Sequence, residues 1–193
     1  MTDTSARSTR TRPHLLVLVG FMGAGKTSVG RELAKFLAWE FVDLDDVIEE
    51  LEQRTVQKIF AVEGELYFRK VELRELQRVL RESDADKVIS VGGGAFTQPG
   101  CAELVAECGA TSILLDAPVE ELRRRVRMGG NIRPLAADRK RFMQLYADRK
   151  SAYEKAHQRF DTAGKSVARV AREIAEWVRT SLIRPAHGSA TEV

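Results

Sequence analysis

Hydrophobic residues along the chain occur in two alternating kinds of pattern. Short continuous apolar runs, such as LLVLV at residues 15–19, have the length and composition of strands that are buried on both faces. Longer segments, such as residues 166–182, carry apolar residues every three or four positions, which is typical of amphipathic helices. Because strands and helices alternate, the sequence predicts a three-layer α/β fold with a parallel sheet between helices.

This alternation assigns most of the chain to regular elements. Strands are predicted at residues 15–19, 40–43, 87–91, 111–115 and 159–162. Helices are predicted at residues 28–38, 47–53, 55–62, 65–81, 99–109, 116–127, 138–157 and 166–182. Residues 43–46 are expected to be an extended segment that leads into the second of these helices.

A single domain is expected over residues 13–183. Residues 1–12 are rich in Ser, Thr and Arg and are expected to be a disordered tail, and residues 184–193 are expected to be a second flexible tail. Residues 128–138 contain two glycines and a proline between arginines, and we expect them to form a mobile lid.

Composition and charge exclude several classes of function. Apolar content of 44% and charged content of 31% indicate a soluble globular protein. The net charge of +3 is too small to indicate a nucleic-acid partner, and no apolar run approaches transmembrane length. Cys101 and Cys108 lack a metal-ligand pattern and are expected to be reduced thiols. We therefore expect a cytoplasmic monomer with no nucleic-acid or membrane partner.

The strongest motif is GFMGAGKT at residues 20–27, which matches the P-loop pattern G-x-x-x-x-G-K-[ST] in full. It lies between a predicted strand and a predicted helix, where backbone N–H groups and the helix N-terminus surround phosphate oxygens. Lys26 is expected to reach the β- and γ-phosphates, and the Thr27 hydroxyl to ligate Mg²⁺. The motif indicates a nucleoside triphosphate but does not identify the phosphoryl acceptor.

Carboxylates follow the second predicted strand. In an open α/β sheet ligands bind at the carboxyl ends of the strands, so Asp43 and Asp45 are expected near the P-loop. A phosphotransferase needs one carboxylate near Mg²⁺ and another near the acceptor hydroxyl. The alternative is that Asp45 or Asp46 only caps the following helix.

Two further features are ambiguous when taken alone. Arg69 and Glu72 share one face of the predicted helix at 65–81, which suits either a surface ion pair or a binding site. The triple glycine at residues 92–94 follows the third strand and suits either close approach of backbone to a ligand or a flexible loop.

Taken together, these segments resemble shikimate kinase, a family of the nucleoside-monophosphate-kinase-like P-loop group. The resemblance runs from about residue 15 to 182 and rests on four segments in the right order, with RPL at 133–135 similar to the lid motif. These segments are GFMGAGKT at 20–27, DLD at 43–45, FRKVE at 68–72 and GGG at 92–94. The resemblance implies a P-loop kinase fold with a five-stranded sheet in the order 2-3-1-4-5. It also implies transfer of phosphate from ATP, with Mg²⁺, to the 3-hydroxyl of shikimate, a step of chorismate and aromatic amino-acid biosynthesis.

The resemblance also assigns roles to individual residues. The expected catalytic residues are Lys26, Asp45 and Arg133. ATP is expected to be bound by Gly23, Ala24, Gly25, Lys26, Thr27, Ser28, Arg127, Arg133 and Lys165. Shikimate is expected to be bound by Asp45, Arg69, Gly92, Gly93, Gly94 and Arg149. Mg²⁺ is expected to be held by Thr27 and Asp43, and Glu72 is expected to orient Arg69.

Two other functions remain as alternatives. The first is another small-molecule P-loop kinase, such as a gluconate or nucleotide kinase, against which Asp45, Arg69 and the triple glycine argue jointly. The second is a catalytically inactive, shikimate-kinase-like binding protein. An inactive relative should have lost at least one functional residue, and those expected are all present: Lys26, Asp43, Asp45 and Arg69.

Overall fold

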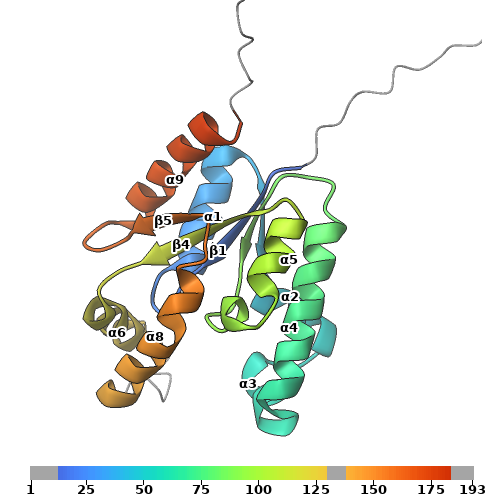
Figure 1. Cartoon of the computed structure of the whole chain (residues 1–193), viewed down its shortest axis with the longest axis vertical. Helices are drawn as coiled ribbons and strands as arrows, with labels where there is room; N and C mark the ends of the chain where they lie inside the picture. The colour runs from blue at the N-terminus through green and yellow to red at the C-terminus, as the bar shows by residue number, and fades with distance from the viewer. Residues whose placement is uncertain (1–12, 130–137, 184–193) are drawn as a thin grey trace, which may run out of the picture.

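The computed structural model describes residues 13–129 and 138–183 (Figure 1). The strands are β1 Leu15–Val19, β2 Glu40–Asp43, β3 Lys87–Ser90, β4 Thr111–Asp116 and β5 Gln158–Asp161. The helices are α1 Lys26–Leu37, α2 Leu44–Glu52, α3 Val56–Val62, α4 Gly64–Arg81, α5 Cys101–Glu107, α6 Val119–Met128, α8 Arg139–Tyr153 and α9 Val167–Ser181, with a 3₁₀ turn, η1, at Ala95–Thr97. The two predicted tails and most of the predicted lid lie outside the described residues.

The strands form one parallel sheet in the order β2-β3-β1-β4-β5, which confirms the predicted fold class and the implied strand order. β1 is the central strand, and all five of its residues are buried because it pairs with β3 and β4 and has helices on both faces. Helices α1 and α9 pack together on one face, whereas α4, α5 and α8 cover the other (Figure 1). No helix among the described residues is long and apolar enough to cross a membrane.

Parallel pairing brings the carboxyl ends of all five strands to one edge of the sheet. The P-loop follows β1, Asp43 ends β2, and the triple glycine follows β3. Asp116 ends β4, and Thr162 follows β5. This edge therefore carries most of the residues for which chemistry was predicted.

Some predicted boundaries are wrong. Helix α2 begins at Leu44 rather than at about Val47, because the Asp43 carboxylate accepts the backbone N–H of Asp45 at 3.1 Å and caps the helix. Asp45 therefore lies in the first helical turn and not in an extended segment. Helix α8 ends at Tyr153 rather than at residue 157, because the chain turns there to enter β5. Cys101 and Cys108 are both free, as expected.

The junction between β1 and the P-loop has no space for a side chain at Gly20. Its φ is 142°, and a methyl group placed on it would lie 2.4 Å from the backbone oxygen of Leu115 in β4. A backbone oxygen in a paired strand cannot move aside as a flexible side chain does. The glycine is therefore needed for β4 to approach the start of the P-loop.

We expect Gly20→Ala to lower the free energy of unfolding by about 2–5 kcal/mol, the sum of backbone strain and overpacking. The control is Gly109→Ala, since Gly109 also has positive φ, at 72°, but has no atom within 4 Å of the added methyl group. Its cost should be about 1–2 kcal/mol, from backbone strain alone. Urea denaturation measures the free energy of unfolding of both variants. Equal losses in Gly20→Ala and Gly109→Ala would contradict the crowding of position 20 against β4.

Candidate active site

A cavity of about 470 Å³ lies at the carboxyl edge of the sheet. Its wall includes these residues predicted for the site: Gly23, Ala24, Gly25, Lys26, Thr27, Ser28, Asp43, Asp45, Gly92, Gly93 and Lys165. The fold therefore brings together residues that are far apart in the sequence. Other residues that were predicted for the site and are described by the structure do not line this cavity: Arg69, Gly94, Arg127 and Arg149.

The phosphate end of the cavity is formed by the P-loop and the N-terminus of α1. Helix α1 begins at Lys26, and its first turn contains no acidic residue that would oppose an anion. The Lys26 ammonium donates to the backbone oxygens of Gly20 at 2.9 Å and Phe21 at 3.3 Å, so the side chain folds back over the loop. This places its positive charge beside the backbone N–H groups that suit phosphate.

Two oxygen atoms that could ligate a metal ion lie side by side next to the P-loop. The Thr27 hydroxyl donates to Asp43 Oδ2 at 2.8 Å, while Asp43 Oδ1 caps α2. Hydroxyl and carboxylate oxygens are the ligand types that Mg²⁺ prefers. The pair therefore has the donor chemistry and the separation to share one cation.

A buried ion pair lies beyond Asp45. Arg69 Nη1 is 2.6 Å from Glu72 Oε2, and Gln98 Nε2 donates to the same oxygen at 2.9 Å. Glu65, at 3.1 Å, holds the other side of the Arg69 guanidinium. Burial raises the pKa of the fully buried Glu72 carboxyl, and the charge of Arg69 opposes that rise. Arg69 is therefore held in one orientation by Glu65 and Glu72, and Gln98 in turn holds Glu72.

The triple glycine is explained by this ion pair. A methyl group on Gly92 would lie 2.4 Å from Glu72 Oε1, and one on Gly94 would lie 2.3 Å from Arg69 Nη2. The loop is ordered, since Ala95 N donates to Gly92 O at 3.0 Å and starts η1. The glycines therefore allow the loop backbone to approach this ion pair closely, and these hydrogen bonds favour an ordered loop over a flexible one. Close approach to a ligand stays a prediction.

Arg149 reaches the same region from α8. Its Nη1 would lie 3.9 Å from a methyl group on Gly93. The charge of Arg149 lowers the pKa of Glu72, whereas the charge of Asp45 raises it. Although Arg69 and Arg149 do not line the cavity, both adjoin the glycine loop that does. The two arginines and Asp45 thus surround one end of the site.

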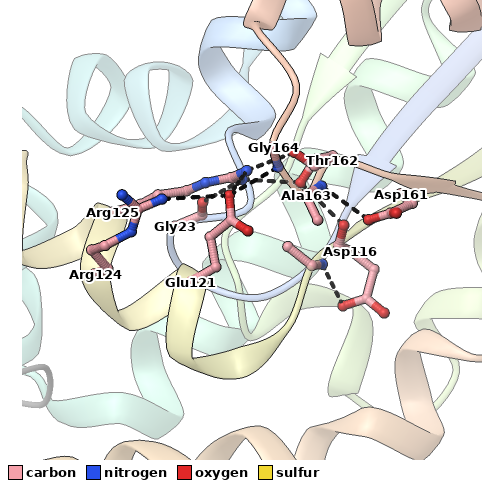
Figure 2. Close-up of polar contacts among 10 residues, drawn as sticks. Gly23, Asp116, Glu121, Arg124, Arg125, Asp161, Thr162, Ala163 and Gly164 are labelled. Carbon is pink, nitrogen blue, oxygen red and sulfur yellow. Dashed lines mark hydrogen bonds and ion pairs between the residues drawn. The ribbon is translucent and has the colours of Figure 1, made fainter.

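At the end of the cavity opposite to Asp45, the wall contains Arg125, whose polar contacts are shown in Figure 2. Arg125 was not predicted for the site. Its Nη2 donates to the backbone oxygen of Thr162 at 2.6 Å and to Glu121 Oε1 at 2.7 Å. Its Nη1 donates to the Thr162 hydroxyl at 2.9 Å and to the backbone oxygen of Gly23 at 3.5 Å. Glu121 also accepts the backbone N–H of Gly164 at 3.2 Å. Arg125 therefore connects α6, the P-loop and the segment after β5.

Comparison with known proteins identifies the family of this chain. The shikimate kinase family model matches residues 22–179. The chain belongs to the shikimate kinase family. The shikimate kinase of Persephonella marina is 39% identical over 165 residues, covering 85% of this chain and 98% of that protein. That of Geobacter metallireducens is 41% identical over 162 residues, covering 82% of this chain and 88% of the relative.

A solved structure gives the same answer. Shikimate kinase from Acinetobacter baumannii, in complex with shikimate, has a TM-score of 0.77 and 32% identity, covering 90% of this chain and 97% of that one. As a member of the shikimate kinase family, this chain is an enzyme, and it is a kinase that uses ATP as the phosphoryl donor.

The shikimate kinase resemblance assigned Arg127 and Arg133 to ATP, and the structure supports neither assignment directly. Arg127 is exposed on α6 and is not in the cavity wall, whereas Arg125, two residues earlier, is. Arg133 lies outside the described residues, so its assignment to ATP stays a prediction. The signals for Arg125 were its spacing of four from Glu121 and the position of Thr162 at the carboxyl end of a strand.

We expect Arg125→Ala to lower the free energy of unfolding by about 1–3 kcal/mol, because charge-assisted bonds to buried oxygens are lost. The matched control is Arg124→Ala. Arg124 is the neighbouring arginine on α6, with a side chain that is 66% exposed and 3.8 Å from Glu121. Its removal should change stability by less than about 0.5 kcal/mol. Denaturant titration compares the two, and equal losses would show that Arg125 does not connect these elements.

Proposed function

We propose that this protein transfers the γ-phosphoryl group of ATP, bound with Mg²⁺, to the 3-hydroxyl of shikimate. The observation that carries the proposal is one cavity that joins a P-loop to Asp45 and to a glycine loop with two arginines beside it. The structural relative from Acinetobacter baumannii contains shikimate, which supports this acceptor. The product, shikimate 3-phosphate, belongs to the biosynthesis of chorismate and aromatic amino acids.

The phosphate end is suited to neutralising the charge that moves during transfer. Backbone N–H groups of residues 23–28 would hold the phosphates, and Lys26 would swing from its backbone partners onto the bridge between the β- and γ-phosphates. Phosphoryl transfer depends mainly on positioning and on electrostatic stabilisation. Fixed donors at this end supply both without reorganisation during the reaction.

Thr27 and Asp43 would hold Mg²⁺. Their oxygens lie 2.8 Å apart, so both could bind one cation if the Thr27 hydroxyl, which keeps its proton, turned its O–H away from Asp43. When bound, the ion would offset negative charge on the phosphates. Asp43 would then both ligate the ion and cap α2, which fixes the direction of Asp45 in the first turn of that helix.

Asp45 would act on the acceptor hydroxyl. The first turn of α2 holds it at the cavity wall, with Oδ1 only 3.3 Å from a methyl group placed on Gly92. A carboxylate there orients the hydroxyl and accepts its proton as phosphate transfers. The helix-capping alternative for Asp45 is not supported, because Asp43 is the residue that caps α2.

Arg69 and Arg149 would bind the shikimate carboxylate. Planar guanidinium groups bind carboxylates through two parallel hydrogen bonds, which a single ammonium cannot provide. Glu65, Glu72 and Gln98 would keep Arg69 in place before the acceptor arrives. This arrangement favours a small anionic acceptor over a neutral sugar.

The far end of the cavity would bind the nucleobase and the sugar of ATP. Its wall contains Arg125, Thr162 and Lys165, and Lys165 is fixed by Glu173 at 2.6 Å. We propose that Arg125 takes the base-side position that the shikimate kinase resemblance assigned to Arg127, with Lys165 beside it. Both long side chains offer alkyl and cationic surface to an aromatic base.

The decisive experiment is ADP release measured with and without shikimate. We expect release to depend on shikimate, and to be much lower with gluconate or with nucleoside monophosphates as acceptors. Mass spectrometry of the product should show one added phosphate on shikimate. Release that is unaffected by shikimate would contradict the proposed function, and preference for gluconate would favour the other small-molecule kinase.

We expect Asp45→Asn to reduce shikimate-dependent turnover by a factor of about 10²–10⁴, the range for a positioned general base. Affinity for Mg²⁺–ATP and the slow hydrolysis of ATP without shikimate should be nearly unchanged. The control is Asp46→Asn, the next carboxylate on α2, which is exposed and 3.5 Å from Arg31. It should keep full activity. An Asp45→Asn variant with full shikimate stimulation would exclude a catalytic role for Asp45.

A further inference from the structure

Tyr153 is a buried polar residue beside the acceptor end that the proposed mechanism does not use. It is the last residue of α8 and lies one helical turn after Arg149, so the two side chains share a face. Tyr153 is only 3% exposed, and its hydroxyl donates a hydrogen bond to the backbone oxygen of Gly93. This bond connects α8 directly to the glycine loop.

The hydroxyl is a permanent donor at neutral pH. Burial raises the pKa of Tyr153 to about 12, because the phenolate would lose its hydration, and the nearby charge of Arg149 opposes only part of this rise. The group therefore stays protonated at any pH at which the protein would work. It also lies close enough to Arg149 for the two to interact.

The backbone oxygens of the glycine loop have different partners. Gly92 O accepts from Ala95 N at 3.0 Å, and Gly94 O accepts from Thr97 N at 3.2 Å, so both are held within the loop. Gly93 O is instead held by Tyr153, from another element. Successive glycines leave the backbone dihedral angles nearly unrestricted, so this peptide group would rotate at low cost without the bond.

Fixing the oxygen of Gly93 also fixes the next amide. The peptide group is planar and trans, so the N–H of Gly94 points away from the oxygen of Gly93. A methyl group on Gly93 would lie 3.6 Å from Met22 N and 3.9 Å from Arg149 Nη1. Gly93 therefore lies where the P-loop, the glycine loop and Arg149 meet.

We propose that Tyr153 is a positioning residue for the acceptor, which holds the glycine loop and Arg149 in the arrangement that receives shikimate. The proposal rests on the proposed function, because shikimate is taken as the acceptor. Tyr153 acts through Gly93 and Arg149 and does not touch the reacting atoms. Its effect should therefore fall on the binding of shikimate and not on that of ATP.

The test is Tyr153→Phe, which keeps the ring and removes the hydroxyl. The KM for shikimate should rise by about 2- to 12-fold, the usual net effect of one hydrogen bond. The KM for ATP and the slow hydrolysis without shikimate should not change. The matched control is Tyr146→Phe on the same helix, whose hydroxyl donates to Asp116 Oδ1 at 3.2 Å, and its KM for shikimate should equal that of the wild type.

The outcomes separate this proposal from the proposed function. Lack of shikimate-dependent ADP release in the wild-type protein would overturn the proposed function and, with it, the role of Tyr153. An active Tyr153→Phe variant with an unchanged KM for shikimate would overturn only the role of Tyr153. Equal increases in both KM values, or the same increase in Tyr146→Phe, would indicate general loosening of α8 and would overturn it as well.

A second measurement uses only the wild-type protein. With ¹⁵N-labelled glycine, the amides of Gly93 and Gly94 should each give one sharp NMR signal before shikimate is added. This result would show that the peptide group is held in one orientation in advance. Doubled or exchange-broadened signals would show that the loop is not positioned until the acceptor binds, and would overturn the proposal.

Discussion

Parallel strand pairing is the constraint on which the rest of this molecule depends. β1 is buried on both faces and pairs in parallel with β3 and β4, so these three strands end at the same edge of the sheet. The ends of β1, β2, β3 and β5 and the segments that follow them contribute polar groups to a common space. One cavity of about 470 Å³ is therefore lined by groups that are distant in the sequence: P-loop N–H groups that can bind phosphate, carboxylates and glycines.

The parts that were predictable from sequence are those determined by local pattern. The apolar run of β1, the P-loop and the periodicity of α9 each identify an element without knowledge of its neighbours. The strand order was not derivable from pattern and came from the family resemblance. The carboxyl-end rule for parallel sheets then placed Asp43 and the triple glycine correctly at one edge.

The parts that were not predictable depend on contacts between elements. The spacing of Arg125 from Glu121 is only a weak local signal in a run of arginines, and the packing of α6 against the P-loop directs Arg125 into the cavity. The early start of α2 depends on which carboxylate turns back to cap it. Likewise, the sequence shows Tyr153 only as one more aromatic residue of a helix. The hydrogen bond of its hydroxyl to Gly93 depends on the packing of α8 beside the loop that follows β3.

The fully buried carboxylate of Glu72 has a consequence for how this end of the molecule can change over evolution. Its partner is Arg69, and the two together occupy the space that side chains at positions 92 and 94 would need. A change at one of the four positions leaves a buried charge without its partner or displaces a guanidinium, and breaking such a pair is costly. These positions should therefore vary together among homologues. Redesign for a different acceptor would have to exchange the whole set in one step.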